Sequence, residues 1–133
     1  MPTASSSHAV TALGQVALTV SDVGRSTTFF RDVVGLRFLF AAGPSLAFFD
    51  VGGVRLMLTA PEGGVSPGGG SVLYFKVDDI LASFAELRAR GLEFVDTPHL
   101  IAPMPDHDLW MVFFTDPDGN SLALMAERSK GAR

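Results

Sequence analysis

The chain has 133 residues, a formal net charge of −4, 47% hydrophobic residues and 18% charged residues, a composition typical of one folded domain and not of a disordered chain. It contains no cysteine, which excludes disulfides, thiolate metal ligands and a cysteine nucleophile. No basic cluster suggests a nucleic-acid partner, no apolar run reaches the length of a membrane helix, and no secretion signal is recognisable. We therefore expect a cytoplasmic protein without nucleic-acid or membrane partners.

The first half of the chain, residues 13–59, predicts a strand, a helix and three further strands. The segment QVALTVSD begins at Gln15 and alternates polar and apolar residues, which is typical of a half-buried strand. It ends at Asp22, whose carboxylate suits a helix N-cap. Gly35 suits the left-handed position after a helix, and the Gly52-Gly53 pair predicts the tight turn of the last hairpin.

The second half, residues 71–128, repeats this pattern after a Gly- and Pro-rich linker over residues 60–70. VLYFKVDD repeats the first strand and ends at the helix-capping Asp79, and GLEF repeats GLRF. Extra residues fall in a proline-rich loop between residues 95 and 108. We expect a single domain over residues 13–128, with flexible tails over residues 1–12 and 129–133.

The repeated pieces QVALTVSD, FFRDVVGL, VLYFKVDD and FFTDPDGNSLAL resemble the vicinal oxygen chelate superfamily, which includes glyoxalase I, bleomycin resistance proteins, fosfomycin resistance enzymes and extradiol dioxygenases. The resemblance runs from Leu13 to about Glu127. It implies an α+β fold in which two βαβββ modules form a cup-shaped, eight-stranded mixed sheet. The helices would cover the outer face and a ligand would sit inside. It also implies a homodimer, with the modules either kept within one chain or exchanged between two.

The same resemblance implies four metal positions, usually filled by His, Glu or Gln. In this sequence they hold Gln15, Met57, Val72 and Ala123. Only the amide of Gln15 offers a hard oxygen ligand, which is too little to hold a divalent ion against water. We therefore expect no metal and no other cofactor.

Strand alternation predicts which side chains face the inside of the cup. This face mixes apolar and polar groups, as small-molecule pockets do. The candidate ligand-binding residues are Gln15, Thr19, Arg55, Met57, Tyr74, Met111, Phe113 and Ala123. Alternatives stay open for several of them: Gln15 as an amide satisfied at a strand end, Arg55 as a solvent-facing charge, and Tyr74 as core packing.

His107 is the candidate general acid or base, because histidine titrates near neutral pH and this one is expected at the mouth of the cup. Asp106 or Asp108 would orient it. Resemblance to the fosfomycin resistance branch places His107 and Phe113 among ligand-contacting positions. The alternative is a surface histidine in a polar turn, and His99 is expected either to pack the loop or to take a functional role.

Three functions fit these observations. The first is a metal-free protein that binds a small aromatic or amphipathic molecule, as bleomycin resistance proteins do. The second is a lyase, isomerase or dioxygenase of the same fold, which uses His107 or an atypical metal site. The third is a dimeric interaction module without a small ligand.

Overall fold

The computed structural model describes residues 8, 10, 12–61, 67–68 and 71–130, and within them the predicted order of strand, helix and three strands occurs twice. The first module consists of β1 (Gln15–Thr19), α1 (Val23–Thr28), the π-helical segment η2 (Phe29–Val34), β2 (Arg37–Ala41), β3 (Leu46–Val51) and β4 (Val54–Thr59). The second consists of β5 (Leu73–Lys76), α2 (Ile80–Ala89), β6 (His99–Pro103), β7 (Asp108–Thr115) and β8 (Ser121–Arg128). The expected tails and linker lie largely outside the described residues.

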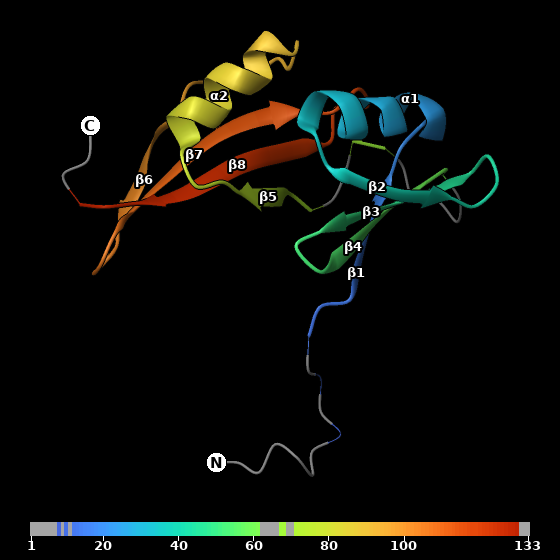
Figure 1. Ribbon diagram of the computed structural model, residues 1–133, viewed down its shortest axis with the longest axis horizontal. Helices are drawn as coiled ribbons and strands as arrows, with labels where there is room; N and C mark the ends of the chain where they lie inside the picture. Colours follow the sequence, from blue (N-terminus) through green and yellow to red (C-terminus); the bar gives the residue numbers. More distant parts are fainter. Residues whose placement is uncertain (1–7, 9, 11, 62–66, 69–70, 131–133) are drawn as a thin grey trace.

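The eight strands form two four-stranded mixed sheets with matching topology. Their orders are β1-β4-β3-β2 and β5-β8-β7-β6, with β1 parallel to β4 and β5 parallel to β8. Both helices lie over the same side of the two sheets, which leaves the opposite sheet faces uncovered (Figure 1). The predicted α+β architecture of two βαβββ modules is confirmed, and the hydrogen-bonded ladders do not join the two sheets into one.

The helices begin where the sequence predicts. The carboxylate of Asp22 accepts from the backbone N–H of Arg25 at 3.0 Å, and that of Asp79 accepts from Ala82 at 3.1 Å. The first helix differs in its second half, where η2 is wider than an α-helix. The N–H of Gly35 closes it by donating to the carbonyl of Phe30, five residues earlier.

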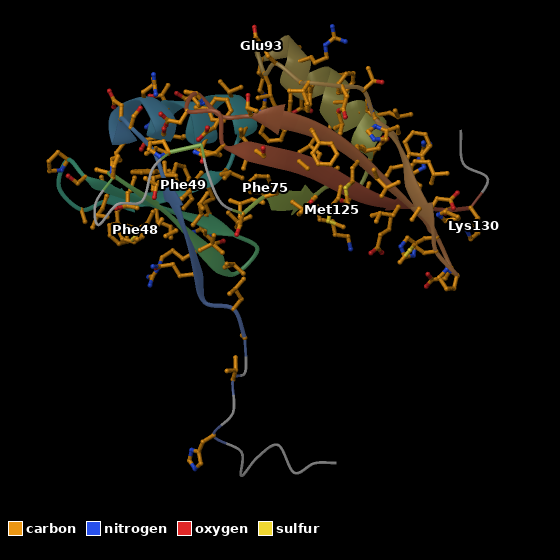
Figure 2. The ribbon with its side chains drawn as sticks, turned by 180° about the vertical axis from the view of Figure 1, so that it is seen from behind. Phe48, Phe49, Phe75, Glu93, Met125 and Lys130 are labelled. Carbon is orange, nitrogen blue, oxygen red and sulfur yellow. The ribbon has the colours of Figure 1, made fainter. Side chains whose placement is uncertain are left out.

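A single apolar core runs between the helices and the sheets of both modules. Its fully buried side chains include Phe30 from η2, Phe49 from β3, Ile80 from α2 and Phe114 from β7. On β3 the neighbours Phe48 and Phe49 (Figure 2) take opposite faces: Phe49 is in the core, and Phe48 stacks on Phe40 with ring centroids 4.8 Å apart. The strand alternation of the sequence therefore gives the correct core face.

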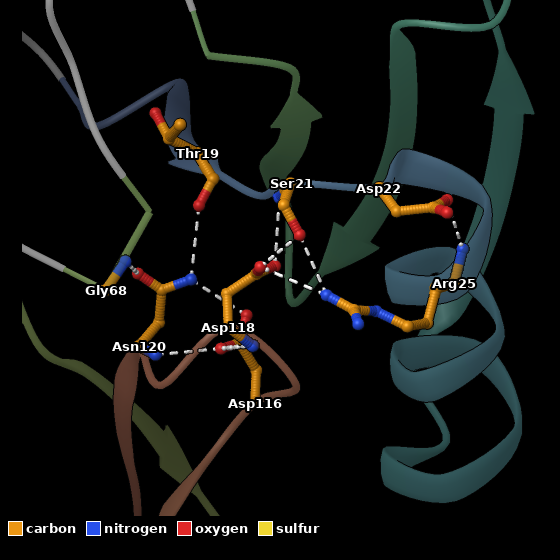
Figure 3. A network of polar contacts seen from close by, with 8 residues as sticks. All are labelled: Thr19, Ser21, Asp22, Arg25, Gly68, Asp116, Asp118 and Asn120. Atoms are coloured by element: carbon orange, nitrogen blue, oxygen red, sulfur yellow. Dashed lines mark hydrogen bonds and ion pairs between the residues drawn. The ribbon is translucent and has the colours of Figure 1, made fainter.

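The turn that precedes β8 connects the two modules (Figure 3). The carboxylate of Asp118 accepts from the backbone N–H of Ser21 at 3.0 Å, from the hydroxyl of Ser21, and from the guanidinium of Arg25 at 3.1 Å. We call Ser21, Arg25 and Asp118 the latch. The side chain of Asp118 is only 6% exposed, so the carboxylate is held by the first module and hardly reaches water.

Two further residues of this turn support the latch. The buried carboxylate of Asp116 accepts from the backbone N–H groups of Asp118 at 3.0 Å and Asn120 at 2.8 Å, which fixes the turn. The side-chain amide of Asn120 donates to the carbonyl of Thr19 at 3.2 Å and accepts from the N–H of Gly68 at 2.8 Å. The turn thus binds both the end of β1 and the segment between the modules.

Candidate functional site

On the uncovered face of the first sheet, three side chains are linked by hydrogen bonds beside an aromatic ring. The guanidinium Nε of Arg55 donates to Gln15 Oε1 at 2.7 Å, and the Gln15 amide donates to the sulfur of Met57 at 3.8 Å. Arg55 also lies over the ring of Phe48, 5.5 Å from its centroid. Pairing of β1 with β4 places Gln15 directly beside Arg55. The result is a positive charge fixed above an apolar surface.

Thr19, predicted with this group, lies at the other end of β1. It is half-buried, and its carbonyl accepts the hydrogen bond from Asn120. The structure therefore places Thr19 beside the latch, where its main chain helps to join the modules.

The second sheet carries an aromatic group on its uncovered face. Tyr74 on β5, Ala123 on β8 and Phe113 on β7 lie side by side in register. The rings of Tyr74 and Phe113 meet edge to face with centroids 6.4 Å apart. Ala123 is fully buried, so a ligand on this face would contact the two rings above its methyl group. Met111 pairs with Met125 two residues further along the same strands.

His107 lies beyond this aromatic group, between two carboxylates. Its Nδ1 is 2.6 Å from Asp106 Oδ1, and its Nε2 is 3.9 Å from a carboxylate oxygen of Glu127. The hydrogen bond from His107 holds the pKa of the Asp106 carboxyl below its usual value, with a smaller contribution from a backbone hydrogen bond. Of the two carboxylates predicted to orient His107, Asp106 contacts its ring, whereas Asp108 pairs with Lys130 at 3.0 Å.

His99 lies closer to the aromatic group than the sequence indicates. Part of the predicted loop over residues 95–108 forms the edge strand β6, in which His99 pairs with Met111. The His99 and Phe113 ring centroids are 6.5 Å apart. An edge strand tolerates Pro103, because its outer N–H groups need no ladder partner. The signal for this strand is the β-prone Leu100-Ile101 pair, which the surrounding prolines obscure.

Two cavities lie along the seam between the modules. One of about 240 Å³ is lined by residues of β1, β4 and β5, and it brings Arg55 of the first sheet together with Tyr74 of the second. The other, about 580 Å³, lies between the end of η2, strand β5 and helix α2, and its lining includes Lys76 and Arg90. The smaller cavity is thus lined by one residue of each predicted ligand-binding group.

The four implied metal positions do not fit a divalent ion. The Gln15 oxygen accepts from the cationic guanidinium of Arg55 at 2.7 Å, so a metal ion bound there would face a positive charge. Met57 offers a thioether, and Val72 and Ala123 have no donor atoms in their side chains. Within the described ranges, no group of three or more His, Asp or Glu side chains is arranged to hold a metal ion.

The described helices are all too short or too polar to span a bilayer.

A family model described as "Glyoxalase/Bleomycin resistance protein/Dioxygenase superfamily" matches residues 12–124. No curated protein matches the chain. Among solved structures, an integron cassette protein from Vibrio cholerae is similar with a TM-score of 0.73 and 21% identity, covering 89% of this chain and 96% of that one.

Two further solved structures are similar over most of their length. TnmS3, an antibiotic binding protein from Streptomyces sp. CB03234, has a TM-score of 0.73 and 24% identity over 91% of this chain and 99% of its own. A lactoylglutathione lyase from Agrobacterium tumefaciens has a TM-score of 0.70 and 23% identity over 89% and 95%. At these identities the likeness shows a shared fold, and the fold serves more than one chemistry.

Proposed function

Because the chain belongs to the glyoxalase/bleomycin resistance protein/dioxygenase superfamily, we propose that it binds a small organic molecule on the uncovered sheet face without the usual divalent metal. The observation that carries this proposal is the hydrogen bond from Arg55 to Gln15 Oε1 at 2.7 Å. It occupies the one hard oxygen at the metal positions and places a cation there instead. That cation attracts an anionic or electron-rich group of a ligand.

The surrounding side chains indicate the class of ligand. The rings of Phe48, Tyr74 and Phe113 favour a planar aromatic or amphipathic molecule, because flat apolar surface is best buried against aromatic side chains. The fold is shared by an antibiotic binding protein and by a lyase, so the side chains of the site, and not the fold, support a role in binding.

The proposal includes a homodimer. Aromatic side chains on the uncovered face are partly exposed, Phe40 at 49% and Tyr74 at 48%, and a second copy that covers this face would complete the cup. A dimer also protects open strand edges from unspecific pairing.

The proposal is tested by a thermal-shift and calorimetric screen of aromatic carboxylates and aromatic antibiotics, with metal analysis of the purified protein. We expect binding by a subset of these compounds, unchanged by a chelator and weakened in Arg55→Gln. Arg37→Gln is the matched control, since Arg37 is an exposed arginine on β2 of the same sheet. A stoichiometric metal ion, or equal affinities in both variants, would contradict the proposal.

A second candidate function is catalysis by His107, favoured by its 2.6 Å contact with Asp106, which is the arrangement of an oriented acid–base pair. It is tested with His107→Ala once a ligand is known. Loss of turnover with retained binding would establish the enzyme. Absence of turnover in the unaltered protein would leave the binding function.

A further inference from the structure

We propose that His99 is a ligand-binding residue whose Nε2 accepts a hydrogen bond from an aromatic ligand with a hydroxyl or N–H group on its ring, such as a phenol. This inference rests on the proposed function and names the chemistry of its ligand. Its basis is the position of His99 at the aromatic group and the contact that fixes the proton on its ring.

The proton position follows from the contact of Nδ1. His99 Nδ1 lies 2.7 Å from the carbonyl oxygen of Thr97. A carbonyl oxygen can only accept, so Nδ1 must carry the hydrogen. In the neutral ring the lone pair is then on Nε2, which makes this atom an acceptor. Among the described residues no hydrogen bond to Nε2 is found.

The carboxylate of Asp96 helps to hold the His99 ring in place. Asp96 Oδ1 accepts from the N–H of Phe113 at 2.9 Å, and Asp96 Oδ2 lies 3.9 Å from His99 Nδ1. Asp96 therefore ties the segment before β6 to β7 and stands on the Nδ1 side of the ring. It is the charged group facing His99 from that segment, whereas β7 presents the uncharged Met111 and Phe113.

The geometry places an acceptor at the edge of an aromatic surface. The His99 ring is tilted by 35° to that of Phe113, and Tyr74 meets Phe113 from the other side. The His99 side chain is 44% exposed, so a ligand can reach it. A ring stacked on Phe113 would bring a substituent at its edge within reach of Nε2, which selects ligands by a donor group.

His107 does not offer the same chemistry. Its Nδ1 contacts the carboxylate of Asp106 and its Nε2 faces that of Glu127. Because carboxylates accept hydrogen bonds, both neighbours favour donor nitrogens on the His107 ring. Because His107 is itself a candidate catalytic residue, the control for His99→Ala is His8→Ala, which removes an exposed histidine outside both groups of predicted ligand-binding residues.

The test compares two probes of similar size, 2-naphthol and 2-methoxynaphthalene, of which only the first has a hydroxyl donor. Their affinities are measured by calorimetry for the unaltered protein, His99→Ala and the control His8→Ala. We expect His99→Ala to weaken the binding of 2-naphthol by about 2- to 12-fold, the range for one net hydrogen bond. The affinity of His99→Ala for 2-methoxynaphthalene should equal that of the control variant within error.

Each other outcome overturns a defined part of the reasoning. Equal effects of His99→Ala on both probes, or no effect on either, would overturn the role of His99 and leave the proposed function intact. Failure of both probes to bind the unaltered protein would overturn the choice of ligand class, whereas failure of the whole aromatic screen would overturn the proposed function as well. Nitrogen NMR of the imidazole provides a readout independent of binding: a proton on Nε2 in the neutral ring would overturn the inference.

Discussion

Replacing the carboxylate of the latch by Asp118→Ala should destabilise the whole domain. The change removes two hydrogen bonds to Ser21 and the ion pair with Arg25. Hydrogen bonds to a charged group contribute about 1.5–3 kcal/mol each where their partners are buried. Ser21 is exposed and Arg25 is 51% exposed, so water takes over part of these contacts and the ion pair adds little. We expect a loss of about 1.5–3 kcal/mol in the free energy of unfolding.

Urea unfolding followed by circular dichroism measures this loss, and Asp32→Ala is the control. Asp32 also pairs with an arginine, Arg31, at 2.8 Å, but both side chains are about half exposed and belong to one helical segment. That variant should lose much less stability than Asp118→Ala, because water screens an exposed ion pair. Equal losses in the two variants would refute the claim that the contact between modules, rather than the ion pair as such, stabilises the fold.

Two further predictions concern local contacts. Gly35→Ala should destabilise by about 1–2 kcal/mol, because Gly35 has φ +88°, a backbone conformation that disfavours a Cβ, whereas the nearby end of the Arg90 side chain is partly exposed and can move aside. Thermal unfolding measures this loss, with Gly14→Ala as the control, because Gly14 has no left-handed φ and no atom within 4 Å of an added Cβ; equal melting temperatures would contradict the prediction. The second prediction is that His107→Ala raises the pKa of the Asp106 carboxyl toward its usual value, because the hydrogen bond that lowers it is lost. A lowered carboxyl pKa stabilises the fold above the unfolded-state pKa, and this contribution disappears as the pH falls through the folded-state pKa. Carboxyl NMR titration checks the shift, and an unchanged Asp106 titration would show that His107 is not its cause.

Much of the fold follows from the repeated sequence pattern. Period-two alternation assigns the core and the opposite face correctly on β1, β4, β5 and β8, because a strand that is half-buried must alternate. The two aspartates before the helices cap them as predicted. These signals are local, so a single sequence contains them.

The features that the sequence analysis did not predict depend on contacts between distant segments. The π-helical widening at η2 has no spacing that distinguishes it from an α-helix in this sequence. Strand β6 is defined by its pairing with β7, whose register includes a bulge between Leu100 and Ala102. Alternation alone could not assign His99 to the aromatic face, because the register across a bulge is not fixed by local sequence. The contact between Arg55 and Gln15 likewise appears only when β1 and β4 pair.

The separation of the backbone ladders into two sheets bears on how the duplicated halves diverge. Each half forms its own strand ladder, so substitutions on the uncovered face of one half do not disturb the strand pairing of the other. The first half contributes the cation of Arg55 above the ring of Phe48, and the second half contributes the rings of Tyr74 and Phe113 and the imidazole of His99. Under the proposed function, substitutions at Arg55 can therefore change the preference for ligand charge without altering the strand pairing of the second half.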